Sequence, residues 1–247
     1  MKLYHYIILV FIIIPNHLFA KTEIINTNYE LKLKIFGVPV KIGEINSFLT
    51  FENSNYSLNF QLYSDKLVNM ITSIDGAGKV SGTMNNSILY PKNYQYTSVR
   101  KKKIKNTTIL FNNSTVTSSK TIPEFDKGKL SPISDEMLVG TIDPVTAIIY
   151  MSNYKLNNKC SIDYKIYDGK RRYDLHYTDI INEGEYTVCR LSQKKIAGFK
   201  LKDKKNDIFK PAQQIETYYK KINNGYVLKK IITKSKFSEI LIDVNYF

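Results

Sequence analysis

The sequence predicts an all-β protein, a mostly antiparallel meander that forms a curved sheet or an open barrel, with one or two short helices. Three observations predict it. Apolar and polar residues alternate along several segments, tight-turn signals recur at hairpin spacing, and the 247 residues include 19 Tyr and 12 Phe. Alternation places one face of a strand on a core and the other in water. Aromatic side chains suit pleated, half-buried surfaces.

The alternation is clearest in three segments. Residues 29–35, 56–62 and 240–246 each place an apolar side chain at every second position. Turn signals follow such segments at intervals that suit hairpins. These signals are Asp75–Gly78, Asp168–Gly169, Asn182–Gly184 and Asn223–Gly225.

Two regions have a weaker pattern. Residues 112–135 are rich in Ser, Thr, Asn and Lys and have little apolar periodicity, which predicts a long loop. The apolar residues of 211–222 fit either a helix or a strand. We favour a strand, because the segment 226–232 needs a partner beyond the Asn-Gly turn.

The first twenty residues predict export. Lys2 precedes a short apolar core over residues 6–14, and Ala20 offers a small residue at a cleavage site. The core is far shorter than the roughly 20 residues that span a bilayer. We therefore expect a signal peptide over residues 1–20, cleaved after Ala20, and a single β-rich periplasmic domain over residues 21–247.

The chain is basic, with a formal net charge of +14. Surplus positive charge suggests a nearby anionic surface, such as phospholipid headgroups. The drift of an AT-rich genome towards Lys, Asn and Ile explains the charge equally well. Export argues against a nucleic-acid partner, and basic runs such as residues 100–103 are typical of solvated strand faces. The expected partner is a lipid, an anionic envelope component or a membrane surface, and nothing in the sequence sets the oligomeric state.

The segment between the two cysteines predicts a β-hairpin. With Asp168 and Gly169 as the turn residues, Tyr167 pairs with Lys170. This register gathers five apolar side chains on one face and charged ones on the other, which supports it. The apolar five are Ile162, Tyr164, Tyr173, Leu175 and Tyr177.

Two arginines follow the turn. Arg171 and Arg172 are the candidate anion-binding residues, because a guanidinium makes bidentate contacts with phosphate or carboxylate and a hairpin would hold it in place. The alternative is that they pair with Asp163, Asp168 or Asp174 and only fix the hairpin.

Cys160 and Cys189 are the only cysteines, and in an exported protein they predict one disulfide, worth roughly 3 kcal/mol. A plain three-strand meander would separate them by two strand spacings, about 9.5 Å, whereas bridged Cα atoms lie about 4.4–6.8 Å apart. Either Cys160 precedes its strand and folds over it, or the sheet order differs, or both thiols are free.

A short helix is predicted after Asp143. This residue supplies a capping side chain and Pro144 suits the first helical position. Val145, Ile148 and Ile149 then fall on one face. We expect Asp143 to act as a helix cap and nothing more.

Catalytic chemistry has few candidates. His176 is the one histidine outside the predicted signal peptide, so a triad or a multi-histidine zinc site has a single histidine to use. No metal site is predicted, because two distant cysteines and one histidine make a structural zinc site only if carboxylates complete it. No cofactor is predicted either: residues 75–78 lack both the Lys and the following helix of a phosphate-binding loop. Scattered carboxylates leave a glycosidase-type pair open. A non-catalytic role is favoured, and enzymatic activity stays an open question.

Several stretches together resemble an uncharacterised family of exported proteobacterial proteins, catalogued as domain of unknown function 3108. The resemblance covers nearly all of the mature chain. It implies a periplasmic, β-rich domain and supplies no activity or catalytic residue. The matching stretches are residues 167–175, with 143–147, Cys160 and Cys189 around them, and residues 29, 36–43, 89–94 and 197–199.

The expected function is that of a non-catalytic periplasmic protein of the cell envelope that binds a lipid-like or anionic ligand, since a half-closed sheet suits an apolar ligand. An outer-membrane β-barrel and a periplasmic hydrolase are the alternatives. Counting back in twos from Phe247 gives Asn245, Asp243, Leu241 and Glu239. That is not the apolar row that a lipid-facing last strand needs.

Overall fold

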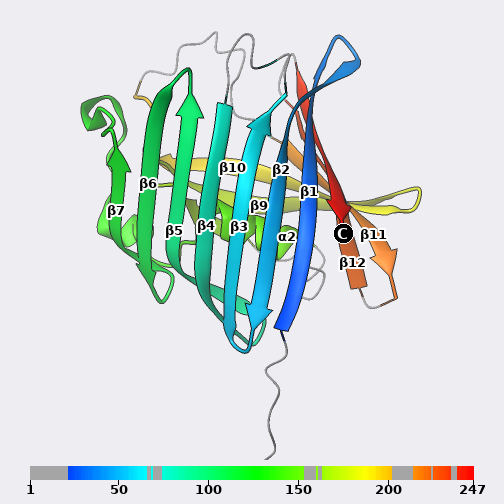
Figure 1. Cartoon of the computed structure of the whole chain (residues 1–247), viewed down its shortest axis with the longest axis horizontal. Coiled ribbons are helices and arrows are strands. Elements are labelled where there is room, and N and C mark those ends of the chain that lie inside the picture. Colours follow the sequence, from blue (N-terminus) through cyan, green and yellow to red (C-terminus); the bar gives the residue numbers. More distant parts are fainter. Residues whose placement is uncertain are drawn as a thin grey trace, which may run out of the picture.

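The computed structural model describes residues 22–65, 68, 74–152, 160, 163–201, 214–223, 225–234 and 238–247. The predicted signal peptide lies outside them. Within these residues one antiparallel sheet has the order β7-β6-β5-β4-β3-β2-β1-β13-β12-β11-β10-β9-β8 (Figure 1). The predicted all-β meander is therefore confirmed. The strands are β1 (Thr22–Ile35), β2 (Val38–Glu52), β3 (Asn55–Ser64), β4 (Ile74–Asn85), β5 (Ile88–Arg100), β6 (Lys103–Asn112), β7 (Thr115–Ile122), β8 (Tyr164–Tyr167), β9 (Arg172–Glu183), β10 (Tyr186–Ala197), β11 (Gln214–Ile222), β12 (Gly225–Lys234) and β13 (Glu239–Tyr246).

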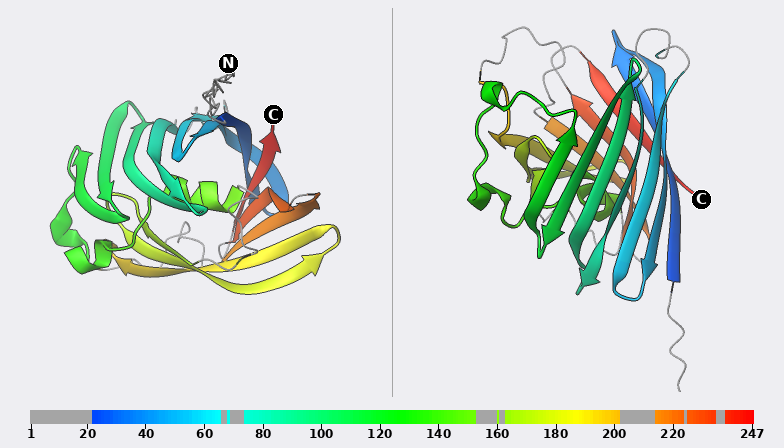
Figure 2. Two further views of the ribbon diagram at one scale, coloured as in Figure 1. Left: turned by 90° about the horizontal axis from the view of Figure 1, so that it is seen from below. Right: turned by 60° about the vertical axis from the view of Figure 1, so that its left-hand side comes forward.

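The sheet curls into two facing walls. β1–β7 form the first wall and β8–β13 the second, with a helix between them (Figure 2). The walls join where β1 pairs with β13, from Thr27↔Tyr246 to Lys34↔Glu239. No helix in the described part of the chain is long and apolar enough to cross a membrane.

The free edges of the sheet, β7 and β8, meet at a seam. The short segment 139–142 lies between them and bonds to both sides. The amide of Thr141 donates to the carbonyl of Ser114, just before β7, at 2.8 Å, and the amide of Ile142 donates to Lys165 of β8 at 2.9 Å. The seam is thus closed by an intervening strand-like piece rather than by direct β7–β8 pairing.

The helix α2 (Pro144–Ser152) fills the space between the walls. The carboxylate of Asp143 accepts hydrogen bonds from the amides of Val145 and Thr146, both at 2.9 Å, so it caps the helix as predicted. Tyr56 of β3 reaches the Thr146 hydroxyl at 3.1 Å. Apolar residues of both walls and of α2 form the core around it.

Residues 112–135 are more ordered than the sequence predicts. They contain β7, so the prediction of a long loop is wrong for that part. Two 3-10 turns follow the strand, η1 (Lys127–Lys129) and η2 (Asp135–Leu138). The sequence pattern does not indicate this strand, because β7 pairs with only one neighbour and buries a single side chain, Thr121. The other residues of β7 are partly or fully exposed to solvent. The preference for a strand in 211–222 is confirmed by β11, and residues 211–213 lie outside the described part.

The hairpin between the cysteines forms, but its predicted register is wrong. Tyr167 pairs with Arg172, and Tyr164 with Leu175, so the loop is four residues long, Asp168–Arg171. The Asp168 side chain favours the wider loop, because it accepts the amides of both Lys170 and Arg171. The register moves by two positions, which leaves the apolar face unchanged. Ile162 lies outside the described residues.

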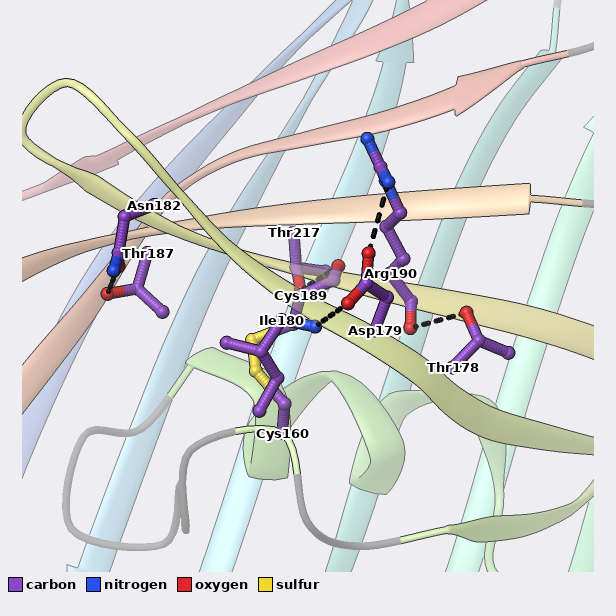
Figure 3. The surroundings of a disulfide bond; sticks show 9 residues. All are labelled: Cys160, Thr178, Asp179, Ile180, Asn182, Thr187, Cys189, Arg190 and Thr217. Carbon is purple, nitrogen blue, oxygen red and sulfur yellow. Dashed lines mark hydrogen bonds and ion pairs between the residues drawn. A yellow bond between two sulfur atoms is a disulfide. The ribbon is translucent and has the colours of Figure 1, made fainter.

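Cys160 and Cys189 form a disulfide, with Cα atoms 5.8 Å apart. Of the three possibilities, the first is correct. Cys160 precedes β8 and approaches Cys189 of β10 from the side of the sheet on which α2 lies (Figure 3). Because Cys160 is not part of the ladder, the two strand spacings between β8 and β10 do not separate the sulfur atoms.

Candidate functional site

The hairpin loop is clamped at the seam. Gly169 adopts φ +87°, and a Cβ there would come within 2.5 Å of the Thr107 side chain on β6. Gly198 adopts φ +78°, and a Cβ there would lie 2.0 Å from the carbonyl oxygen of Lys170. Both positions need glycine for conformation and for space. The loop therefore has little freedom relative to either wall.

The two arginines of the loop differ. Arg171 is half exposed, and its Nε donates to Asp168 at 2.8 Å. Arg172 is buried; its Nε donates to the carbonyl of Met137 at 2.8 Å, and its guanidinium also contacts the Asp174 carboxylate. These ion pairs agree with the alternative that both fix the hairpin. Anion binding by the pair stays a prediction, and Arg171 is the member that solvent reaches.

A pocket of 360 Å³ lies beside the loop, and we call it the seam pocket. Most of its lining is apolar, and the charged side chains in that lining are two lysines. This combination of size, apolar walls and few polar groups is typical of small-molecule sites. The lining residues are Phe125, Lys127, Leu130, Ser131, Pro132, Ile133, Leu138, Tyr167, Lys170 and Gly198.

Lys170 dominates the electrostatics of the seam pocket. Its ammonium lies 5.5 Å from the centre of the Phe125 ring. Partial burial lowers the pKa of Lys170, and the positive charges of Lys105 and Arg171 lower it further. Asp168 opposes this shift, but its carboxylate is already engaged by the loop amides and Arg171. The site thus gathers positive charge beside an apolar pocket.

A larger hollow, of 480 Å³, crosses β1–β4. Its lining includes Phe48 and Phe247, and no charged side chain of the described residues lines it. Its volume would favour this hollow as a binding site, yet the hollow is open and its described lining offers no positively charged side chain. The chemistry of an anionic ligand favours the seam pocket. The amide side chains of the hollow are Asn26, Asn28, Asn46, Asn59 and Gln61.

His176 lies between two carboxylates. Its Nδ1 is 2.8 Å from Asp163, and its Nε2 is 3.7 Å from Asp174. Among the described residues, no hydroxyl forms a hydrogen bond with this ring. The same part of the chain holds no group of three His, Cys, Asp or Glu side chains that could bind a metal.

The sequence pointed to the loop but missed the pocket. The sequence predicts that Lys170 pairs with Tyr167 directly after the turn, next to the candidate arginines, and indicates no ligand contact for it. The apolar lining comes largely from residues 125–138, which have no periodic pattern and belong to no strand. The pocket closes only where this connection packs against residues 198–201. There the amide of Ser131 donates to the carbonyl of Phe199 at 2.8 Å.

Comparison with known proteins places the chain in a family. A search of curated proteins finds no match. The structure is similar to a crystal structure of a beta-barrel-like protein of domain of unknown function DUF1849 from Brucella abortus, with 9% identity and a TM-score of 0.47 over 92% of this chain and 99% of that one. The profile of a family of proteins of unknown function matches residues 28–244. The chain therefore belongs to the DUF3108 family, as its sequence motifs indicated.

Proposed function

We propose that this protein is a non-catalytic protein of the cell envelope that binds an amphipathic anion in the seam pocket. The apolar part of the ligand would contact Phe125 and its apolar neighbours, and the anionic head would lie beside Lys170. This assignment unites the two expected ligand properties, lipid-like and anionic, at one place. Arg171, half exposed on the same loop, is the second group within reach of the head.

One observation carries the proposal. Lys170 borders an apolar pocket, and no carboxylate of the described residues lines that pocket. A partly buried ammonium near other positive charges is unfavourable unless an anion joins it. The lowered pKa of Lys170 has this cause, and a bound phosphate or carboxylate would reverse it.

The location of the ligand follows from what fills the rest of the molecule. Aromatic side chains from both walls, among them Tyr56, Tyr94, Tyr164 and Tyr219, are buried against α2 or against one another. In the described part of the chain, side chains of the protein itself thus fill much of the space between the walls. We therefore assign the ligand to the seam rather than to the space between the walls.

The periplasm is part of the proposal. The N-terminal segment has the layout of a signal peptide. The Cys160–Cys189 disulfide supports an oxidising compartment, because disulfides persist there and are rare in the cytosol.

Titration calorimetry with n-decyl phosphate tests this function. We expect the wild-type protein to bind it, and Lys170→Gln to bind at least about tenfold more weakly, because a charge-assisted hydrogen bond is lost. Lys92→Gln is the matched control: it removes one exposed positive charge on β5, away from the lining of the seam pocket, and should bind normally.

Two results would contradict the proposal. Equal affinity for n-decanol, which has the same tail and no charge, would show that Lys170 does not select an anion. Unchanged affinity in Lys170→Gln, with the same thermal unfolding as the wild type, would place any binding elsewhere.

A further inference from the structure

The two ends of the first wall carry different turns. The β1–β2 turn, Phe36-Gly37, and the β5–β6 turn, Lys101-Lys102, lie at one end, which is the upper end in Figure 1. Three other turns, at Asn53-Ser54, Asn86-Ser87 and Asn113-Ser114, lie at the opposite end. The described turns at one end are thus apolar or cationic, and those at the other end are polar and uncharged.

The β1–β2 hairpin extends an apolar tip beyond the sheet. Pairing of β2 with β3 begins at Gly43, and the carbonyl of Ile42 accepts from the amide of Asp65 at 3.0 Å. In the described part of the chain, the pairing on that side therefore stops short of residues 38–41. Phe36 at the turn is fully exposed, and Val38 and Val40 are 63% and 43% exposed. We call these three residues the apolar tip. Such an apolar projection suggests a partner outside the chain.

The β5–β6 turn supplies positive charge at the same end. Arg100, Lys101, Lys102 and Lys103 follow one another there, and no ion pair involves them among the described residues. We call residues 100–103 the basic turn. Lysines near the base of the β1–β2 hairpin differ, since each contacts a carboxylate, as Lys34 does with Glu239 at 3.3 Å. The basic turn therefore keeps its charge for an external partner.

Exposed apolar side chains accompany the basic turn. Ile104 follows it directly on β6, and Ile122 lies at the same end of the neighbouring strand β7. They are 57% and 51% exposed. The upper end thus repeats the combination of apolar and cationic groups at two places in the wall.

The backbone conformation indicates that Phe36, Lys101 and Lys102 are not the residues that would best stabilise these turns. Phe36, Lys101 and Lys102 adopt φ of +50°, +47° and +63°. Positive φ is unfavourable for such residues, whereas Asn tolerates it, and the opposite end places Asn53 and Asn86 at the same kind of position. At the first position of the turn, the upper end therefore accepts a local conformational cost that Asn lowers at the other end. At the second position both ends place a residue other than Gly or Asn at positive φ, Lys102 at the upper end and Ser87 and Ser114 at the lower.

We propose that the upper end of the first wall docks on an anionic lipid surface, with the apolar tip inserted among the headgroups and the basic turn facing their phosphates. Charge complementarity selects the lipid phosphates. A lipid surface also accommodates an apolar projection without a matching pocket, which an acidic protein would have to provide. The proposal is independent of ligand binding in the seam pocket.

Co-sedimentation with vesicles tests the proposal. We expect the wild-type chain without its signal peptide to bind vesicles that contain phosphatidylglycerol, less strongly at high salt, and to bind pure phosphatidylcholine vesicles weakly. Lys101→Asn/Lys102→Gly should bind about thirtyfold more weakly, as expected for two basic residues near an anionic surface. Phe36→Asn should also weaken binding. Asn and Gly suit positive φ, so these variants should fold at least as well as the wild type.

The matched control removes two positive charges from elsewhere. Lys92→Gln/Lys221→Gln changes the net charge equally, and Lys92 and Lys221 lie towards the ends of β5 and β11 that are opposite to the basic turn. This variant should bind the anionic vesicles nearly as well as the wild type. An equal loss of vesicle binding in the control would show that the effect depends only on the net charge of the protein, and it would overturn the proposal. No binding of the folded wild type to anionic vesicles at low salt would also overturn it and favour an acidic protein partner.

Discussion

The two walls of the sheet are built in different ways. In the first wall, β1–β7 are joined largely by two-residue turns such as Asn53-Ser54 and Asn86-Ser87, and its strands are 8 to 15 residues long. In the second wall, β8 has only four residues and a disulfide ties β10 to Cys160, whereas shifts of register occur in both walls. The first wall is stabilised by the pairing of strands that follow one another in the sequence. The second wall depends more on long-range contacts, and the seam pocket lies at its edge.

The largest expected effect is the loss of the disulfide. Cys160→Ala/Cys189→Ala should lower the free energy of unfolding by between about 3 and 4 kcal/mol, because the bridge closes a loop with a sequence separation of 29. Urea unfolding measures the loss. Amide hydrogen exchange sharpens the comparison: protection should fall in β8–β10 and persist in β2–β5. A uniform fall across both walls would mean that the walls do not differ in local stability.

The second effect is a pH dependence centred on Asp143, between the walls. Burial raises the pKa of this carboxyl to about 6, even though its hydrogen bonds to the helix oppose the shift. Its contribution to stability is therefore full below the ordinary pKa near 4 and is lost as the pH rises through 6. The loss is on the order of 3 kcal/mol.

Urea unfolding between pH 4 and pH 7 checks this dependence, with Asp143→Asn as the matched variant. The amide keeps a capping oxygen and does not titrate. The difference in stability between the variant and the wild type should change over this range in the variant's favour as the pH rises. A constant difference would show that Asp143 does not titrate there.

The third effect is confined to the seam. Gly198→Ala places a Cβ 2.0 Å from the carbonyl oxygen of Lys170 at a φ of +78°, so the hairpin loop must move. We expect a loss of about 2 kcal/mol in unfolding free energy. Gly184→Ala is a useful control, because φ there is +58° but no atom lies within 4 Å of the added Cβ. An equal loss of unfolding free energy in both variants would assign the cost to the backbone conformation alone. The close contact between Gly198 and the hairpin loop would then not contribute to stability.

The same contrast explains what the sequence could predict. In the first wall, alternation over residues 29–35 and 56–62 identifies strands, because one face is buried and the other meets water. β7 was missed because an edge strand with one buried side chain has almost no alternation. Propensity and pattern are local, so they predict elements that depend on local contacts.

In the second wall, and at the site, the decisive contacts are not local. The hairpin was found from Asp168-Gly169, but its register was wrong because the Asp168 side chain stabilises a longer loop. The disulfide geometry depends on where Cys160 leaves the ladder. The seam pocket depends on the backbone hydrogen bonds between residues 129–131 and residues 198–201. No pattern within either segment encodes that meeting.

The pairing of β1 with β13 has a consequence for how the chain folds. Lys32 and Asp243 are a diagonal pair in this ladder, in which Lys32 lies opposite Leu241. They form an ion pair at 2.8 Å, although they are 211 residues apart in the sequence. The edge of β1 that pairs with β13 therefore stays unpaired until the last strand has been synthesised. Until then this edge can pair with strands of other chains. Contacts of such long sequence separation slow the search for the native state. A chain of this topology has a particular need for protection from aggregation between synthesis and completion of the sheet.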